Sequence, residues 1–106
     1  MIIVSTDQID GMKIVEVIGL VKGNSIRAQH AGQDFLAFLR NLIGGEVRNY
    51  TKLIAESREQ AIDRMVAEAE SKGANAIVCC RLVTASIMKG TSEILAFGTA
   101  VRVEEE

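Results

Sequence analysis

Residues 50–83 read YTKLIAESREQAIDRMVAEAESKGANAIVCCRLV, and the rest of the chain can be placed around this stretch. Its first two thirds predict one long amphipathic helix, because apolar residues recur at the spacing of a single buried face and charged residues occupy the other side. Gly73 falls where a left-handed residue ends a helix, and Ala74 can fold back onto the last turn. The start is less sharply marked, since Asn49 can act as a cap and a start at Val47 is also compatible. The apolar face consists of Tyr50, Leu53, Ile54, Ala61, Ile62, Met65, Val66 and Ala69.

The residues after Gly73 predict a β-strand over 75–84, because β-branched residues dominate and nothing charged interrupts them before Arg81. Side chains alternate across a regular strand. One face should therefore carry Val78, Cys80 and Leu82, and the other Ile77, Cys79, Arg81 and Val83. Both predicted faces are largely apolar, which bears on how the sheet is covered.

Length and composition indicate a single domain spanning residues 1–106 of an ordinary soluble type, with 25% charged residues and a formal net charge of −2. No long basic run and no interleaving of aromatic and basic residues occurs along the sequence, so nucleic acid is not an expected partner. The apolar run at residues 1–4 is too short for a signal peptide or a membrane span, and we expect a cytoplasmic protein with no membrane partner. The two cysteines are adjacent and should be reduced.

The remaining segments predict short strands at 2–4 and 12–22, a polar connection at 23–31, a helix at 32–43 stopped by Gly44-Gly45, and a last strand at 93–103. Gly19 and Gly23 should weaken and end the second of these strands, with a bulge as one possible form. The strands at 75–85 and 93–103 should pair as a hairpin. The fold class is therefore α+β, an antiparallel sheet with two helices packed on one face.

Two helices can cover only one face of such a sheet, yet the strands at 14–21, 76–83 and 94–103 are apolar on both faces. A monomer would leave a large apolar surface in water, which soluble monomers rarely do. We therefore expect identical chains to bury the second face against one another in a closed homo-oligomer.

Several short motifs resemble the YbjQ-like family of small bacterial and archaeal proteins of unassigned function, often labelled "putative heavy-metal-binding". The motifs lie in order along nearly the whole chain: residues 19–23, Asp34, Gly44-Gly45, Tyr50, Arg58, Ala61, residues 73–76 and residues 98–101. The resemblance implies a dodecin-subunit-like fold and a ring-shaped homopentamer, and it implies no established activity. At Cys79-Cys80 this chain departs from the glycine and aliphatic residue that we expect in the family.

The two cysteines and the single histidine, His30, are the candidate metal ligands. Thiolates favour soft ions such as zinc or copper(I). Because Cys79 and Cys80 should point to opposite faces, one chain cannot easily offer both to one ion, and symmetry copies would have to gather several Cys79 thiols. The alternative is that both cysteines are small packing residues. His30 lies in a polar segment with no second ligand at suitable spacing, which favours an ordinary surface histidine.

Asp34, Tyr50 and Arg58 form a candidate ligand-binding set. Arg58 lies four residues after Ile54, at the edge of the apolar helix face, where it could anchor an anionic ligand or pair with Asp34 and orient the two helices. No phosphate-binding glycine loop, nucleophile elbow or acid-base pair is present, so we do not expect an enzyme. The leading hypothesis is a non-catalytic oligomer that binds a metal ion or small ligand at a subunit interface or central channel. The alternative is a structural or protein-interaction scaffold without a ligand.

Overall fold

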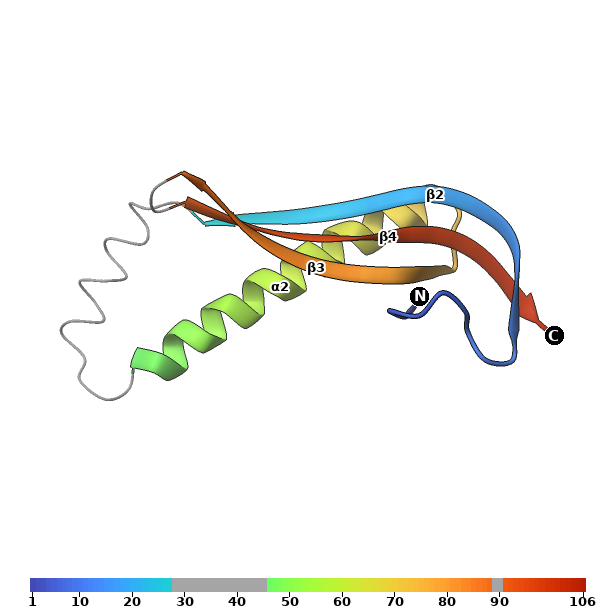
Figure 1. Ribbon diagram of the computed structural model, residues 1–106, viewed down its shortest axis with the longest axis horizontal. Coiled ribbons are helices and arrows are strands. Elements are labelled where there is room, and N and C mark those ends of the chain that lie inside the picture. The colour runs from blue at the N-terminus through green and yellow to red at the C-terminus, as the bar shows by residue number, and fades with distance from the viewer. Residues whose placement is uncertain (28–45, 89–90) are drawn as a thin grey trace.

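The structure, a computed structural model, describes residues 1–27, 46–88 and 91–106. One long helix packs against one face of a four-stranded sheet whose strand order is β1-β3-β4-β2 (Figure 1). The elements are β1 (Ile2–Ile3), β2 (Met12–Arg27), α2 (Glu46–Ser71), β3 (Ala76–Met88) and β4 (Thr91–Glu105). The helix predicted at 32–43 lies outside the described residues.

The end of α2 has the predicted glycine stop. Gly73 has a φ of 83°. The N–H of Ala74 donates to the carbonyl of Ala69 at 3.1 Å, and the N–H of Gly73 donates to that of Glu70 at 3.0 Å. These two bonds are those of a Schellman motif, in which a left-handed residue lets the chain fold back on the last turn. The chain then enters β3 almost at once.

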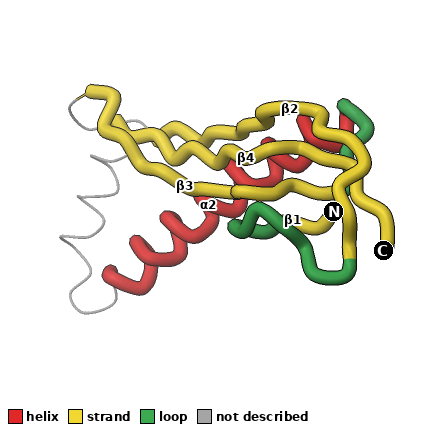
Figure 2. The backbone as a smooth tube through the Cα atoms, turned by 45° about the vertical axis from the view of Figure 1, so that its right-hand side comes forward, coloured by secondary structure: helices red, strands yellow, loops and turns green. Residues whose placement is uncertain are grey.

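The sheet is mixed rather than purely antiparallel, which corrects the predicted topology. β3 pairs antiparallel with β4 as the predicted hairpin, and β2 pairs antiparallel with β4 on its other side. β1, however, runs parallel to β3, with Ile2 opposite Ala76 and Ile3 opposite Ile77. The N-terminal segment thus lies along the outer edge of β3 (Figure 2), a contact between distant parts of the chain that local sequence patterns do not encode.

β2 continues to Arg27, so the polar connection predicted from Gly23 begins later than expected. Gly23 is buried against α2, where an added Cβ would overlap the backbone of Ala61 and Met65. The glycine therefore marks the closest approach of helix and strand and does not end the strand. Gly19, in contrast, has a φ of 140° and sits at a register shift in the pairing with β4, so the bulge expected there is confirmed.

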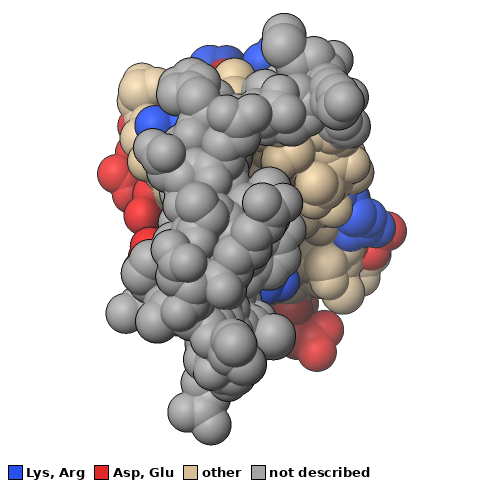
Figure 3. Space-filling view, turned by 90° about the vertical axis from the view of Figure 1, so that its left-hand side faces the viewer, with Lys and Arg blue, Asp and Glu red and all other residues tan. Residues whose placement is uncertain are grey.

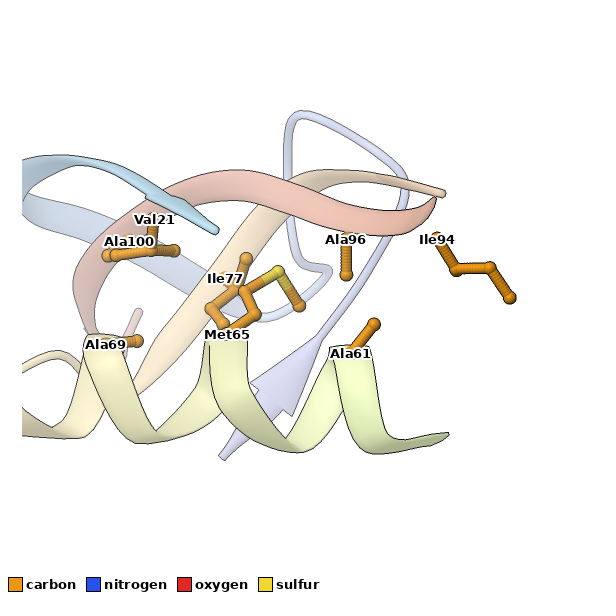
Figure 4. Packing of buried hydrophobic residues seen from close by; sticks show 8 residues of the cluster. All are labelled: Val21, Ala61, Met65, Ala69, Ile77, Ile94, Ala96 and Ala100. Atoms are coloured by element: carbon orange, nitrogen blue, oxygen red, sulfur yellow. The ribbon is translucent and has the colours of Figure 1, made fainter. Parts of the chain in front are cut away.

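The main core lies between α2 and the sheet. Ala61, Met65 and Ala69 project from the helix towards strand side chains (Figure 4). The small residues Ala96 and Ala100 on β4 are buried under the helix and let it approach closely. The buried cluster consists of Val21, Ala61, Met65, Ala69, Ile77, Ile94, Ala96 and Ala100.

A second, smaller cluster lies on the opposite face of the sheet, at the end near the N-terminus. Its buried residues are Ala76, Val78, Val101 and Val103. Val4, Ile9 and Met12 pack against them, so residues 4–12 cover this end of the second face. We call the side of the sheet away from α2 the open face.

Candidate functional site

Cys79 and Cys80 form a β-bulge opposite a glycine. Val78 pairs with Thr99 and Arg81 pairs with Phe97, so the two cysteines together face only Gly98. Cys79 has a φ of 56°, the left-handed conformation that glycine adopts in one common bulge type. A Cβ at Gly98 would lie 2.6 Å from Cγ2 of Ile77, so a side chain there would not fit beside the bulge. The bulge and the glycine therefore depend on each other.

The N-terminal segment satisfies the backbone groups that the bulge removes from the β3–β4 pairing. The N–H of Cys79 donates to the carbonyl of Thr6 at 2.9 Å, and the N–H of Cys80 donates to that of Val4 at 3.0 Å. Arg81 adds a side-chain bond, from Nη1 to the carbonyl of Ser5 at 2.8 Å. A pair of unbonded N–H groups at this position would be costly, and the segment thereby holds the bulge in place.

The bulge changes which residues share a face with each cysteine. Cys80 packs with Ile77 against the core under α2, whereas Cys79 packs with Val78 against the cluster on the open face. The prediction that the two thiols point to opposite faces is confirmed. Arg81 and Val83 share the face of Cys79, and Leu82 shares that of Cys80, as predicted. Only Ile77 and Val78 lie on the face opposite to the predicted one, because a strict alternation leaves out the extra residue of the bulge.

The surroundings of the two thiols make them unequal metal ligands. Burial raises the pKa of the Cys80 thiol, an effect that the nearby Arg81 charge opposes, so Cys80 is less available as a thiolate at neutral pH. Cys79 is half-buried, and its cluster supplies apolar side chains and the thioether of Met12. Within the described ranges, no three His, Cys, Asp or Glu side chains are grouped so that they could hold a metal ion.

The other predicted site residues are only partly described. His30 and Asp34 lie outside the described residues, and Tyr50 belongs to the first turns of α2 with its side chain outside them as well. Arg58 is exposed on α2, beside the buried Ser57 and four residues from the half-buried Ile54. It therefore lies at the margin of the buried stripe, and its pairing with Asp34 stays a prediction.

The open face exposes large apolar side chains beyond the part covered by residues 4–12. Val17 is 66% exposed, Leu20 63%, Ile26 53% and Val83 46%. Their register partners on β4 place these side chains on the same side as Val101, Thr99, Glu93 and Leu95, respectively. Exposed apolar side chains are thus spread over more than one strand of this face, as the two-faced strand patterns predict.

One charged row crosses this apolar surface. Phe97 on β4 is paired directly with Lys22 on β2 and with Arg81 on β3, so the three side chains lie side by side on the open face. We call these residues the basic row. No local sequence pattern groups the three residues, because they lie far apart in the chain and only the strand register brings them together.

A polar hollow of about 430 Å³ opens beside the smaller cluster, at the end of the sheet where β2 begins and β4 ends. Its lining includes Asp10, Lys13 and Glu106 but not the described site candidates Arg58, Cys79 and Cys80. Figure 3 views the molecule from the opposite end, where both positive and negative side chains are visible beside uncharged ones. Among the described residues no helix has the length and apolar character that a membrane crossing requires.

Comparison with known proteins identifies relatives that match almost end to end. A UPF0145 protein of Dehalococcoides mccartyi is 53% identical over 104 residues, which cover 98% of this chain and 100% of the relative. A UPF0145 protein of Clostridioides difficile is 50% identical over 106 residues, which cover 100% of this chain and 95% of the relative.

A crystallised Pediococcus pentosaceus protein of unknown function, from the DUF74 family, shares the fold with a TM-score of 0.64 at 14% identity, covering 98% of both chains. Residues 1–104 match the YbjQ family model, which is described as "Putative heavy-metal-binding". This chain therefore belongs to the YbjQ family, together with the UPF0145 proteins that it resembles at about half of all positions.

Proposed function

We propose that this protein is a non-catalytic, cytoplasmic homo-oligomer that binds a small ligand or a heavy-metal ion where its copies meet. The observation that supports this most directly is the exposure of Val17, Leu20, Ile26 and Val83 on the open face. Fully burying each such side chain is worth about 1.5–3 kcal/mol, so several of them together favour association. The family resemblance adds a ring of five copies to this proposal.

Cys79 is the metal-ligand candidate that the geometry supports best. Its side chain is half-buried on the open face, in the cluster against which residues 4–12 also pack, while Cys80 packs towards α2. A closed ring repeats each residue around its axis, so several Cys79 thiols could converge even though one chain offers one. The description of the family as heavy-metal-binding points to the same kind of ligand.

Native mass spectrometry of protein purified without a metal-affinity tag tests the proposal. The expected result is an oligomer of the 11.5 kDa chain that gains a stoichiometric adduct when zinc or copper(I) is added. Cys79→Ser should abolish that uptake, whereas Cys80→Ser should retain it and lower stability, because Cys80 fills space under α2. Equal loss of uptake in both variants would contradict the separate roles of the two thiols.

The second candidate function is a scaffold that carries no ligand. The absence of a three-ligand group in the described parts of the chain favours this reading, as does the apolar packing around Cys79. A bare oligomer that takes up neither metal nor small anions in the same measurement would support it. A monomer would contradict both functions.

A further inference from the structure

We propose that the basic row is a binding site for a small, planar, aromatic anion. The site consists of Lys22, Phe97 and Arg81 on three adjacent strands of the open face. It deepens the proposed function by naming a ligand class. All three residues belong to one chain, so a single chain can form the site. Only the neighbouring copy that would cover the site rests on the proposed function.

The geometry places one aromatic ring between two cationic side chains. In a directly opposed antiparallel pair the Cβ atoms are about 5 Å apart, so Lys22 and Arg81 flank Phe97 at about that distance on either side. Phe97 is half-buried, while both flanking residues are exposed. A planar ring can stack on Phe97 while an acidic substituent reaches a flanking cation. The row holds a single aromatic residue, which suits one ring better than a nucleic-acid strand with successive stacked bases.

Arg81 is held in position without being neutralised. Its Nη1 donates to the carbonyls of Ser5 at 2.8 Å and Cys80 at 2.9 Å. Both acceptors are neutral, and in the described portion of the chain Arg81 has no carboxylate partner. A guanidinium has five N–H donors, so donors remain for a phosphate or carboxylate. The side chain is therefore ordered in advance for an anion.

The nearby carboxylates do not remove the positive charge of the row. Glu93 on β4 lies four residues from Phe97 on this face, and it accepts a hydrogen bond from Nδ2 of Asn24 at 2.9 Å. Glu68 belongs to α2 on the other side of the sheet, where it accepts from the backbone N–H of Lys22 and pairs with the side chain of Lys72 at 3.2 Å. If a second copy covers the open face, two unpaired cations would be costly to bury. A bound anion would offset that cost.

Isothermal titration calorimetry on the intact protein at low ionic strength tests the proposal with two probes. Adenosine 5′-monophosphate offers a phosphate and 2-naphthoate offers a carboxylate, so the two probes separate the sources of negative charge. At least one should bind with one site per chain. Adenosine lacks the charge, and inorganic phosphate lacks the ring. Each should bind at least about tenfold more weakly, because each loses either a charge-assisted hydrogen bond or a stacked ring.

Variants assign the binding to the row. Arg81→Gln and Lys22→Gln should each weaken the bound probe about tenfold, and Phe97→Leu about fivefold to tenfold. Arg102→Gln is the matched control, since Arg102 pairs with Glu16 outside the row, and it should bind as the unaltered protein does. Circular dichroism establishes that each variant is folded, and Phe97→Leu keeps the test valid if Arg81→Gln does not fold.

Two results would overturn the site: neither probe binds, or Phe97→Leu and Lys22→Gln bind as tightly as the unaltered protein. Light scattering on the same samples separates this proposal from the proposed function. An oligomer without binding rejects the basic row alone, and would indicate that a second copy supplies the opposing charge. A monomer that still binds the probe upholds the row and rejects the shared interface.

Discussion

Gly23 and Gly98 are buried where backbone comes close to another element. At Gly23, β2 contacts the backbone of α2, and at Gly98, β4 contacts the bulge of β3. Neither glycine has a left-handed φ, so space rather than backbone conformation requires them. Such positions resemble loop glycines in the sequence, which is why the sequence analysis ended the strand at Gly23.

Gly23→Ala should destabilise the protein by about 1–3 kcal/mol, the usual cost of overpacking. The added methyl group would overlap the carbonyl oxygen of Ala61 and the amide nitrogen of Met65, and helix backbone cannot rotate away as a side chain can. Urea unfolding followed by circular dichroism measures the loss. Lys13→Ala, an exposed change on the same strand, should stay within about 0.5 kcal/mol. An unchanged midpoint for Gly23→Ala would contradict the close contact.

Residue patterns predicted where the cysteines point but not how they are held. Alternation places neighbouring residues on opposite faces, and Cys79 and Cys80 do lie on opposite faces. The bulge became visible only from the register, in which two residues of β3 face Gly98. The unusual φ of Cys79 is consistent with the glycine that the family resemblance led us to expect at this position.

At the scale of elements, α2 was predicted well because its signals are local. The buried stripe through Ala61, Met65 and Ala69 has helical spacing, and Gly73 supplies the left-handed stop. β2 was predicted less well, because residues 22–27 are polar. Ser25 is buried at the helix interface and donates to Oε1 of Gln60 at 2.8 Å. A polar strand residue that bonds to a helix side chain has no distinctive sequence pattern.

Glu68 links α2 to β2 and makes the stability of this contact depend on pH. It accepts a hydrogen bond from the N–H of Lys22 at 3.3 Å and pairs with Lys72 at 3.2 Å. These hydrogen bonds, with that from Lys22 the larger influence, lower the pKa of the Glu68 carboxyl. A carboxyl with a lowered folded-state pKa stabilises the protein fully above its unfolded pKa, and the contribution is lost as the pH falls through the folded value.

Glu68→Gln should therefore reduce the loss of stability that occurs as the pH falls from the ordinary pKa of glutamate through the lowered pKa of Glu68. Urea midpoints at several pH values measure the difference. Glu70→Gln, which removes an exposed carboxylate two residues further along α2, should keep the pH dependence of the unaltered protein. If Glu68→Gln follows the same pH curve as the unaltered protein, Glu68 does not carry this linkage.

At the scale of the whole molecule, the sequence predicted the layers and the exposed second face but not the mixed sheet or the basic row. β1 pairs with β3 although more than seventy residues separate the paired residues Ile2 and Ala76 in the sequence. Strand patterns state how each strand is buried, whereas the partner and register come from the folded chain. The basic row depends on the register of β4 with β2 and with β3. It could therefore not be predicted from the order of residues.

Leu20→Glu should dissociate the proposed oligomer into folded 11.5 kDa chains. Leu20 is 63% exposed on the open face, so a glutamate there is well solvated in one chain but would lose its hydration when a second copy covers it. Light scattering coupled to size-exclusion chromatography gives the mass, and circular dichroism monitors the fold. Ala67→Glu, on the exposed side of α2, is the matched control and should keep the mass of the unaltered protein. An unaltered protein that is already a single chain at micromolar concentration, or a Leu20→Glu variant of undiminished mass, would show that the open face is not where the copies meet.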